Sequence, residues 1–242
     1  MEKLSSNSLA SRFVNAYNML DHSLRTQYNF KANISFSDLI RRTATLNQVI
    51  RLYEDELIDL ARLRNAIIHS KSEQVIAEPH EDVVETMEKV AKIISTPPLV
   101  VDVIKKINVD TIEAGASMRD YIVMSAEVGH SSVPVYKRDM LVGVLQRHTV
   151  LEGLGHVMKS SRSLDDFLKS TTTEVFLRDF PNNKNHFTIT SSRVTIEEVL
   201  ELFTNRKLSA VIITSDGTSG GKLTGIVTNA DVLNLMHILE GY

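Results

Sequence analysis

The chain has 242 residues, of which 43% are hydrophobic, and a formal net charge of −3. This composition is that of a globular protein with room for more than one domain. Cysteine is absent, which excludes disulfides, thiolate catalysis and zinc sites built on cysteine. Apolar runs stay short of the ~20 residues that span a bilayer, and the first residues lack an apolar signal segment. We therefore expect a cytoplasmic protein with no membrane partner, in which any RNA contact needs a local basic patch.

The first ninety-odd residues show only helical periodicity. Apolar residues recur there at steps of three and four in four stretches: 8–26, a segment starting after Ser37, 53–68 and 81–94. Without a strand pattern, these stretches predict an antiparallel helical bundle. The pair Pro97-Pro98 ends it, because proline cannot continue a helix and stiffens the exit. We place this domain at residues 1–96.

A short motif near the end of the third stretch breaks the apolar pattern. Arg64 lies in phase with its apolar positions, Asn65 follows, and His69 closes the segment RNAIIH. A guanidinium on an apolar stripe must be paired, reach solvent or face a polar groove. The segment resembles the R-x4-H motif of HEPN domains, over roughly residues 5–95. Those domains are four-to-five-helix bundles that usually dimerise and are often metal-independent ribonucleases.

The resemblance implies a catalytic set of Arg64, Asn65 and His69 that requires no metal. His69 would accept the proton of a ribose 2′-hydroxyl, and Arg64 would stabilise the charge of the transition state. Asn65 would orient the phosphate or the histidine. In the alternative interpretation, Arg64 and His69 cap the helix C-terminus and pair with a neighbouring acid.

The remainder of the chain contains an internal repeat. Residues 143–154 (GVLQRHTVLEGL) and 225–236 (GIVTNADVLNLM) share one pattern, in which a strand starting with glycine runs into an apolar helix. A β-type run precedes each copy, and an amphipathic helix precedes that run. The order strand, helix, strand, hairpin, strand, helix is therefore predicted twice. Units this small cannot close a core alone, so the two should pack together.

This doubled pattern resembles a tandem pair of CBS domains, the family named for its occurrence in cystathionine β-synthase. The resemblance spans roughly residues 99–242. Ser117 and Thr195 are expected to begin the helices of the two copies through capping boxes. The predicted fold class is α + α/β: a helical bundle followed by two β-α-β-β-α units, placed at residues 97–160 and 161–242.

A candidate nucleotide site follows from the end of the second copy. The strand ends and the helix begins near Thr228, so helix N–H groups would face an anion, and Asp231 lies about one turn on. The resemblance implies that Asp231 accepts both ribose hydroxyls, that Thr228 holds ribose or phosphate, and that the adenine lies against apolar strand residues. The alternative is ordinary helix capping by both residues. The predicted nucleotide-binding residues are Thr228, Asp231, Ile189, Thr190, Ala210, Ile212, Arg147 and His148.

The first copy departs from this pattern. Gln146 stands in place of the threonine and Thr149 in place of the aspartate, so the carboxylate that grips ribose is missing. We expect this first site to be empty or altered. Arg147 and His148 would then serve the second site, because the two pockets of a pair share one cleft.

These patterns predict a regulatory protein that senses an adenine nucleotide (AMP, ADP or ATP). The nucleotide would bind in the cleft near Asp231, and Pro97-Pro98 would transmit its occupancy to the bundle. We expect a homodimer with the Arg64 helix near the two-fold interface. Two other functions stay open: a nucleotide-gated, metal-independent ribonuclease acting on RNA at the helical domain, and a purely structural dimerisation module.

Overall fold

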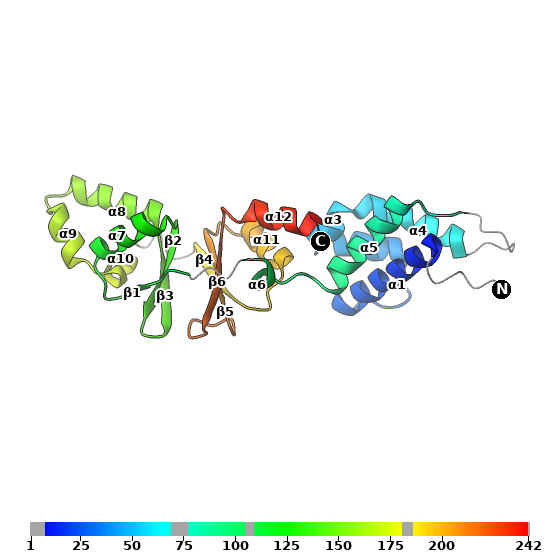
Figure 1. Cartoon of the computed structure of the whole chain (residues 1–242), viewed down its shortest axis with the longest axis horizontal. Coiled ribbons are helices and arrows are strands. Elements are labelled where there is room, and N and C mark those ends of the chain that lie inside the picture. Colours follow the sequence, from blue (N-terminus) through cyan, green and yellow to red (C-terminus); the bar gives the residue numbers. More distant parts are fainter. Residues whose placement is uncertain (1–7, 69–76, 105–108, 181–185, 242) are drawn as a thin grey trace. The chain divides into compact units, whose positions relative to one another are not determined.

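The computed structural model describes residues 8–68, 77–104, 109–180 and 186–241. The chain divides into two compact units (Figure 1), one made of residues 1–98 with 239–242 and the other of residues 99–238. Within the described ranges, no helix is long and apolar enough to cross a membrane.

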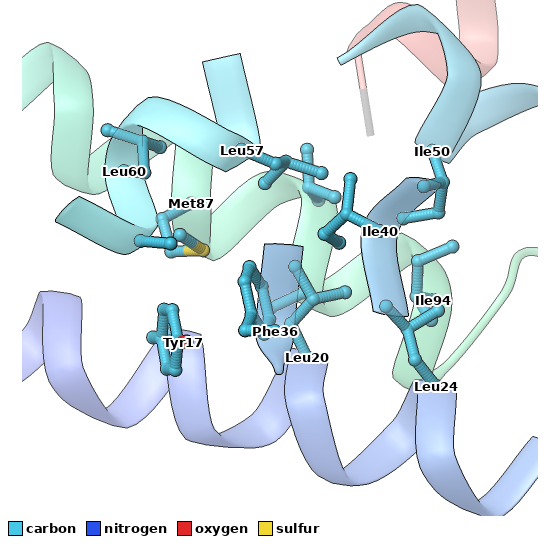
Figure 2. Packing of buried hydrophobic residues seen from close by; sticks show 14 of the residues in the cluster. Tyr17, Leu20, Leu24, Phe36, Ile40, Ile50, Leu57, Leu60, Met87 and Ile94 are labelled. Carbon is cyan, nitrogen blue, oxygen red and sulfur yellow. The ribbon is translucent and has the colours of Figure 1, made fainter. Parts of the chain in front are cut away.

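The described residues of the first unit form five helices and no strand, apart from the end of α12 (Val232–Gly241). All five contribute to its core, and Leu20, Phe36 and Ile40, from two of them, point into the same interior (Figure 2). The helices are α1 (Leu9–Gln27), α2 (Phe36–Ala44), α3 (Gln48–Leu52), α4 (Glu54–Ile68) and α5 (Glu81–Ser95).

The prediction of the second helix of this unit is wrong in two respects: the helix begins earlier, and it is interrupted. It begins at Phe36, because the Ser35 side chain accepts a hydrogen bond from the N–H of Asp38. It ends at Ala44, and Asn47 then caps a new helix by accepting from the N–H of Ile50 at 2.8 Å. Leu46 falls in this break and is 53% exposed.

The second unit contains the same fold twice. In each repeat the first two strands are parallel and the last two antiparallel, with a register shift at the equivalent place. The first repeat comprises β1 (Ile112–Glu113), α7 (Met118–Val128), β2 (Ser132–Lys137), β3 (Met140–Gln146) and α8 (Arg147–Lys159). The second comprises β4 (Phe187–Ser191), α11 (Ile196–Asn205), β5 (Ala210–Thr214), β6 (Leu223–Thr228) and α12 (Val232–Gly241). Both therefore have the expected β-α-β-β-α order.

Capping boxes begin the first helix of each repeat, as the sequence predicts. The Ser117 hydroxyl accepts from the N–H of Asp120, whose carboxylate accepts from the N–H of Ser117. Thr195 and Glu198 make the same reciprocal pair at the start of α11. The two helices are thus aligned residue by residue from their N-caps.

The two sheets pack against each other through apolar side chains. Leu141 and Val144 of β3 form one buried cluster with Ala210 and Ile212 of β5. At the hairpin end, the N–H of Leu141 donates to the carbonyl oxygen of Ser219 at 2.8 Å. Both repeats therefore contribute to one core, as expected of units too small to fold alone.

Each repeat is preceded by a short helix that packs on the other repeat. Leu99 begins α6 (Val100–Val103) and forms a β-bridge with Thr195 of the second repeat. Thr172 begins α10 (Thr173–Asp179) and forms the equivalent bridge with Ser117 of the first. The two repeats are thereby joined by a reciprocal exchange of their preceding helices.

A glycine lies at each of these contacts. A Cβ atom on Gly143 would be 2.7 Å from Cδ1 of Leu177, and one on Gly225 would be 2.5 Å from Cδ1 of Ile104. Leu177 and Ile104 stand at the same position counted from the N-caps Thr172 and Leu99. The glycine that opens each motif thus allows the exchanged segment to approach the sheet closely.

Because of this exchange, the boundary between the repeats lies later in the chain than the sequence predicts. The sequence places it at residue 160/161, but α9 (Leu164–Ser170) and α10 belong to the core of the first repeat. Phe167 and Phe176 are buried there, and the Phe176 ring stacks on Phe180 with centroids 4.6 Å apart. These aromatic side chains add a large apolar area to the core of the first repeat.

Candidate functional site

Thr228 and Asp231 lie together at the junction of β6 and α12. One carboxylate oxygen of Asp231, Oδ2, accepts from the Thr228 N–H at 2.8 Å and from the Thr228 hydroxyl at 2.9 Å. These bonds close the turn that leads from β6 into α12, which begins at Val232. They also fix the orientation of the carboxylate. Among the described residues, both bonds fall on Oδ2, so Oδ1 is available to a ligand hydroxyl.

Asp231 also lines a pocket of about 210 Å³. Its walls come from the region of α6, from the middle of β6 and from the first turns of α12. Its lining residues are Val103, Ile104, Val109, Thr224, Gly225, Ile226, Asp231, Asn234 and Leu235. An apolar wall with a few convergent polar groups is typical of small-molecule sites. Its volume lies below the ~300 Å³ at which small-molecule sites usually begin, so the pocket can enclose only part of a larger ligand.

The four strand residues that the sequence assigns to the apolar wall of this site lie elsewhere in the structure. Ala210 and Ile212 are fully buried between the two sheets, and Ile189 packs against the same cluster. Thr190 lines a different pocket, of about 610 Å³, along α11. None of the four lines the Asp231 pocket, whose apolar wall comes from Val103, Ile104 and Val109.

Residues before the first repeat thus complete a site at the end of the second. Sequence reasoning missed them because it drew the apolar wall of the site from the strands of the second copy alone. One available signal was the glycine that opens each motif, since an unsubstituted Cα indicates a close approach by another segment.

The equivalent position in the first repeat has no carboxylate. A cavity of about 360 Å³ surrounds Gly143 and is lined by residues of β3, α10 and β4. Gln146 and Thr149 are 1% and 2% exposed, and within the described part of the chain their Oε1 and Oγ1 atoms lack hydrogen-bond partners. At this position the first repeat therefore has buried side-chain oxygens, whereas the second has an aspartate that lines a pocket.

Arg147 and His148 do not line the Asp231 pocket. Arg147 Nη2 donates to the carbonyl oxygen of His130 at 2.8 Å, and its side chain lines a cavity between α7 and α8. The His148 ring lies edge-on to His186, just before β4, with centroids 6.3 Å apart. The structure thus separates both from the acid they were expected to assist.

In the helical unit, Arg64 is half-buried on the ring of Tyr17. Its guanidinium carbon is 5.3 Å from the ring centroid, and Nη1 donates to Asn65 Oδ1 at 3.4 Å. Its Nε is buried with no hydrogen-bond partner among the described residues. Burial raises the pKa of Tyr17 to about 12, against the opposing charge of Arg64. His69 lies outside the described residues, so the catalytic set stays a prediction.

Comparison with known proteins finds one family match, within the second unit. Residues 177–238 match the family model for the CBS domain. No curated protein matches the chain. Among solved structures, the CBS domain of a bacterial CNNM/CorC family Mg²⁺ transporter in complex with ATP is 20% identical, with a TM-score of 0.46 over 66% of this chain and 98% of that one.

Two further structures have similar scores. One is CBSX2 in complex with AMP, which is 18% identical, with a TM-score of 0.44 over 59% of this chain and 98% of that one. The other is the CBS domain of a CBS domain containing membrane protein from Sphaerobacter thermophilus. It is 14% identical, with a TM-score of 0.45 over 57% of this chain and 87% of that one.

Proposed function

We propose that this protein is a regulatory sensor that binds an adenine nucleotide in the Asp231 pocket. The observation that carries the proposal is the Asp231 carboxylate, held by Thr228 through one oxygen and lining a pocket with an apolar wall. The free oxygen would accept the ribose hydroxyls, and the adenine would lie against Ile104 and Val109. AMP, ADP and ATP share this nucleoside.

The proposal includes coupling to the helical unit. Ile104 lines the pocket shortly after the Pro97-Pro98 connection, and Asn234 and Leu235 line it from α12. The chain passes between the two units at residues 98/99 and 238/239. A ligand that favours one arrangement of these walls would therefore act on both segments that lead to the helical unit.

The test is thermal denaturation of the full chain with AMP, ADP, ATP and GTP. At a nucleotide concentration of a hundred times Kd, binding should stabilise the protein by about 2.7 kcal/mol. Asp231→Ala should abolish the shift, whereas Thr149→Ala, its counterpart in the first repeat, should keep it. Circular dichroism of the unliganded variants checks that both are folded. No shift with any nucleotide at millimolar concentration would refute the proposal.

Metal-independent RNA cleavage remains a second proposal for the helical unit. It is favoured by the buried Nε of Arg64, which lacks a partner among the described residues, as expected of a cation not used only for packing. Cleavage that persists in EDTA and disappears in His69→Ala would support it. Cleavage unchanged in that variant would assign the activity to a contaminant or another site.

A further inference from the structure

A separate cavity lies in the first repeat, between α7 and α8. Its volume is about 350 Å³, within the range of small-molecule sites. Ile122, Val150 and Leu154 give it an apolar wall, and Ser125 and Arg147 give it polar lining. It shares no lining residue with the Asp231 pocket.

The polar residues of this cavity make few or long hydrogen bonds, and the Ser125 hydroxyl donates to the carbonyl oxygen of His130 over 3.5 Å. Arg147 donates to His130 through Nη2, which holds the guanidinium in place while its other donors remain for a ligand. The nearby acid Asp110 is paired with His130 instead, at 3.0 Å. Tyr121, which also lines the cavity, has a buried hydroxyl whose one neighbouring polar side chain among the described residues is Ser125. Native proteins rarely leave the hydrogen bonding of a buried hydroxyl incomplete without a reason.

The second repeat serves as an internal comparison. Alignment from the N-caps Ser117 and Thr195 places Val199 at the position of Tyr121 and Phe203 at that of Ser125. Alignment from the strand ends places Asn229 at the position of Arg147. The same fold therefore forms with apolar, bulky and neutral residues at these positions, so the polar cavity of the first repeat is not required for folding.

We propose that this cavity binds a small monocarboxylate with an apolar body. The carboxylate would pair with Arg147 and replace the His130 carbonyl oxygen as the acceptor of the Ser125 hydroxyl. The apolar body would lie against Ile122, Val150 and Leu154. A guanidinium suits this ligand because it matches the planar carboxylate through parallel N–H donors. The site is independent of nucleotide binding at Asp231.

The test is calorimetric titration of the full chain with decanoate, with decanol as the uncharged probe. Ser125→Phe introduces the residue of the second repeat, fills the cavity and should weaken decanoate binding at least about tenfold. Ser125→Ala leaves the cavity open and should cost less than about fivefold, the loss of one hydrogen bond. Arg147→Gln should weaken decanoate about tenfold and leave decanol unchanged.

Two outcomes would overturn the proposal. One is the absence of decanoate binding to the wild-type protein at millimolar concentration, and the other is equal binding by wild type and Ser125→Phe. Melting temperatures of the variants establish that they fold. If light scattering shows self-association that Ser125→Phe removes while decanoate does not bind, the cavity is a contact between copies of the chain and the proposal is also wrong.

Discussion

The two repeats of the second unit have the same topology and differ at the start of their last helix. In the second repeat, Thr228 holds Asp231 at the edge of a pocket. In the first, Gln146 and Thr149 are buried with unsatisfied oxygens. The features that the repeats share are capping boxes, paired strands and a glycine where the exchanged helix approaches. The fold therefore depends on these shared features, and the proposed ligand site depends on a few residues that the fold tolerates in either form.

The exchanged helices extend this comparison. Helix α10 brings Phe176 into the core of the first repeat, and α6 places Val103 at the equivalent position on the second. Valine is smaller than phenylalanine, and Val103 lines the Asp231 pocket. Helix α10 thus adds to the core of the first repeat, whereas α6 contributes to the lining of a pocket at the second.

The largest expected effect is that of Phe176→Ala. Removing a fully buried ring should lower the free energy of unfolding by about 3–5 kcal/mol. Val103→Ala, at the equivalent position, should cost less because it removes two methyl groups from a partly exposed side chain, and it should weaken nucleotide binding. Calorimetric melting of both variants measures the difference. Equal destabilisation would contradict the distinction between the two helices.

The substitution Thr149→Asp should have the next largest effect on the free energy of unfolding. It places the acid of the second repeat at a position only 2% exposed in the first, and burying a carboxylate without its partners should cost about 2–4 kcal/mol. Adding Gln146→Thr supplies the hydroxyl that Thr228 provides in the second repeat and should recover part of this loss. Urea denaturation of the single and double variants tests the coupling. Additive losses would show that Thr228 does not support its acid in the way inferred.

Alanine at the two glycines should have smaller effects. The added Cβ meets the flexible end of Leu177 at position 143 and of Ile104 at position 225, so each variant should lose about 1 kcal/mol as the side chain shifts. Only Gly225→Ala should weaken nucleotide binding, since Ile104 lines the Asp231 pocket. Binding isotherms of both variants distinguish this outcome from a general loss of stability.

The smallest effect is a dependence of stability on pH. Hydrogen bonds from the Ser117 hydroxyl and N–H lower the pKa of Asp120 in the folded protein. A depressed folded pKa gives stability that is present above the unfolded pKa and lost as pH falls through the folded one. Asp120→Asn should therefore reduce the melting temperature at about pH 7 and have little effect at about pH 2. A difference that persists in acid would exclude the carboxylate as its origin.

Local patterns determined much of this architecture. Helical periodicity and paired prolines predicted a helical region before residue 97, and the repeated motif predicted two β-α-β-β-α units. Capping boxes at Ser117 and Thr195 are confirmed because each depends on residues three apart. The resemblance to CBS domains is supported over residues 177–238. The HEPN-like assignment of the helical region stays a prediction.

The tertiary structure alone decided which distant segments meet. The sequence by itself identified Thr228 and Asp231, which are neighbours on one turn, but it assigned Ile189, Ala210 and Ile212 to their pocket. Those strand residues are covered by the opposite sheet, and Val103, Ile104 and Val109 take their place. The physical reason is that local hydrogen bonds specify turns and helix ends, whereas packing between repeats depends on which apolar surfaces cover each other across the fold.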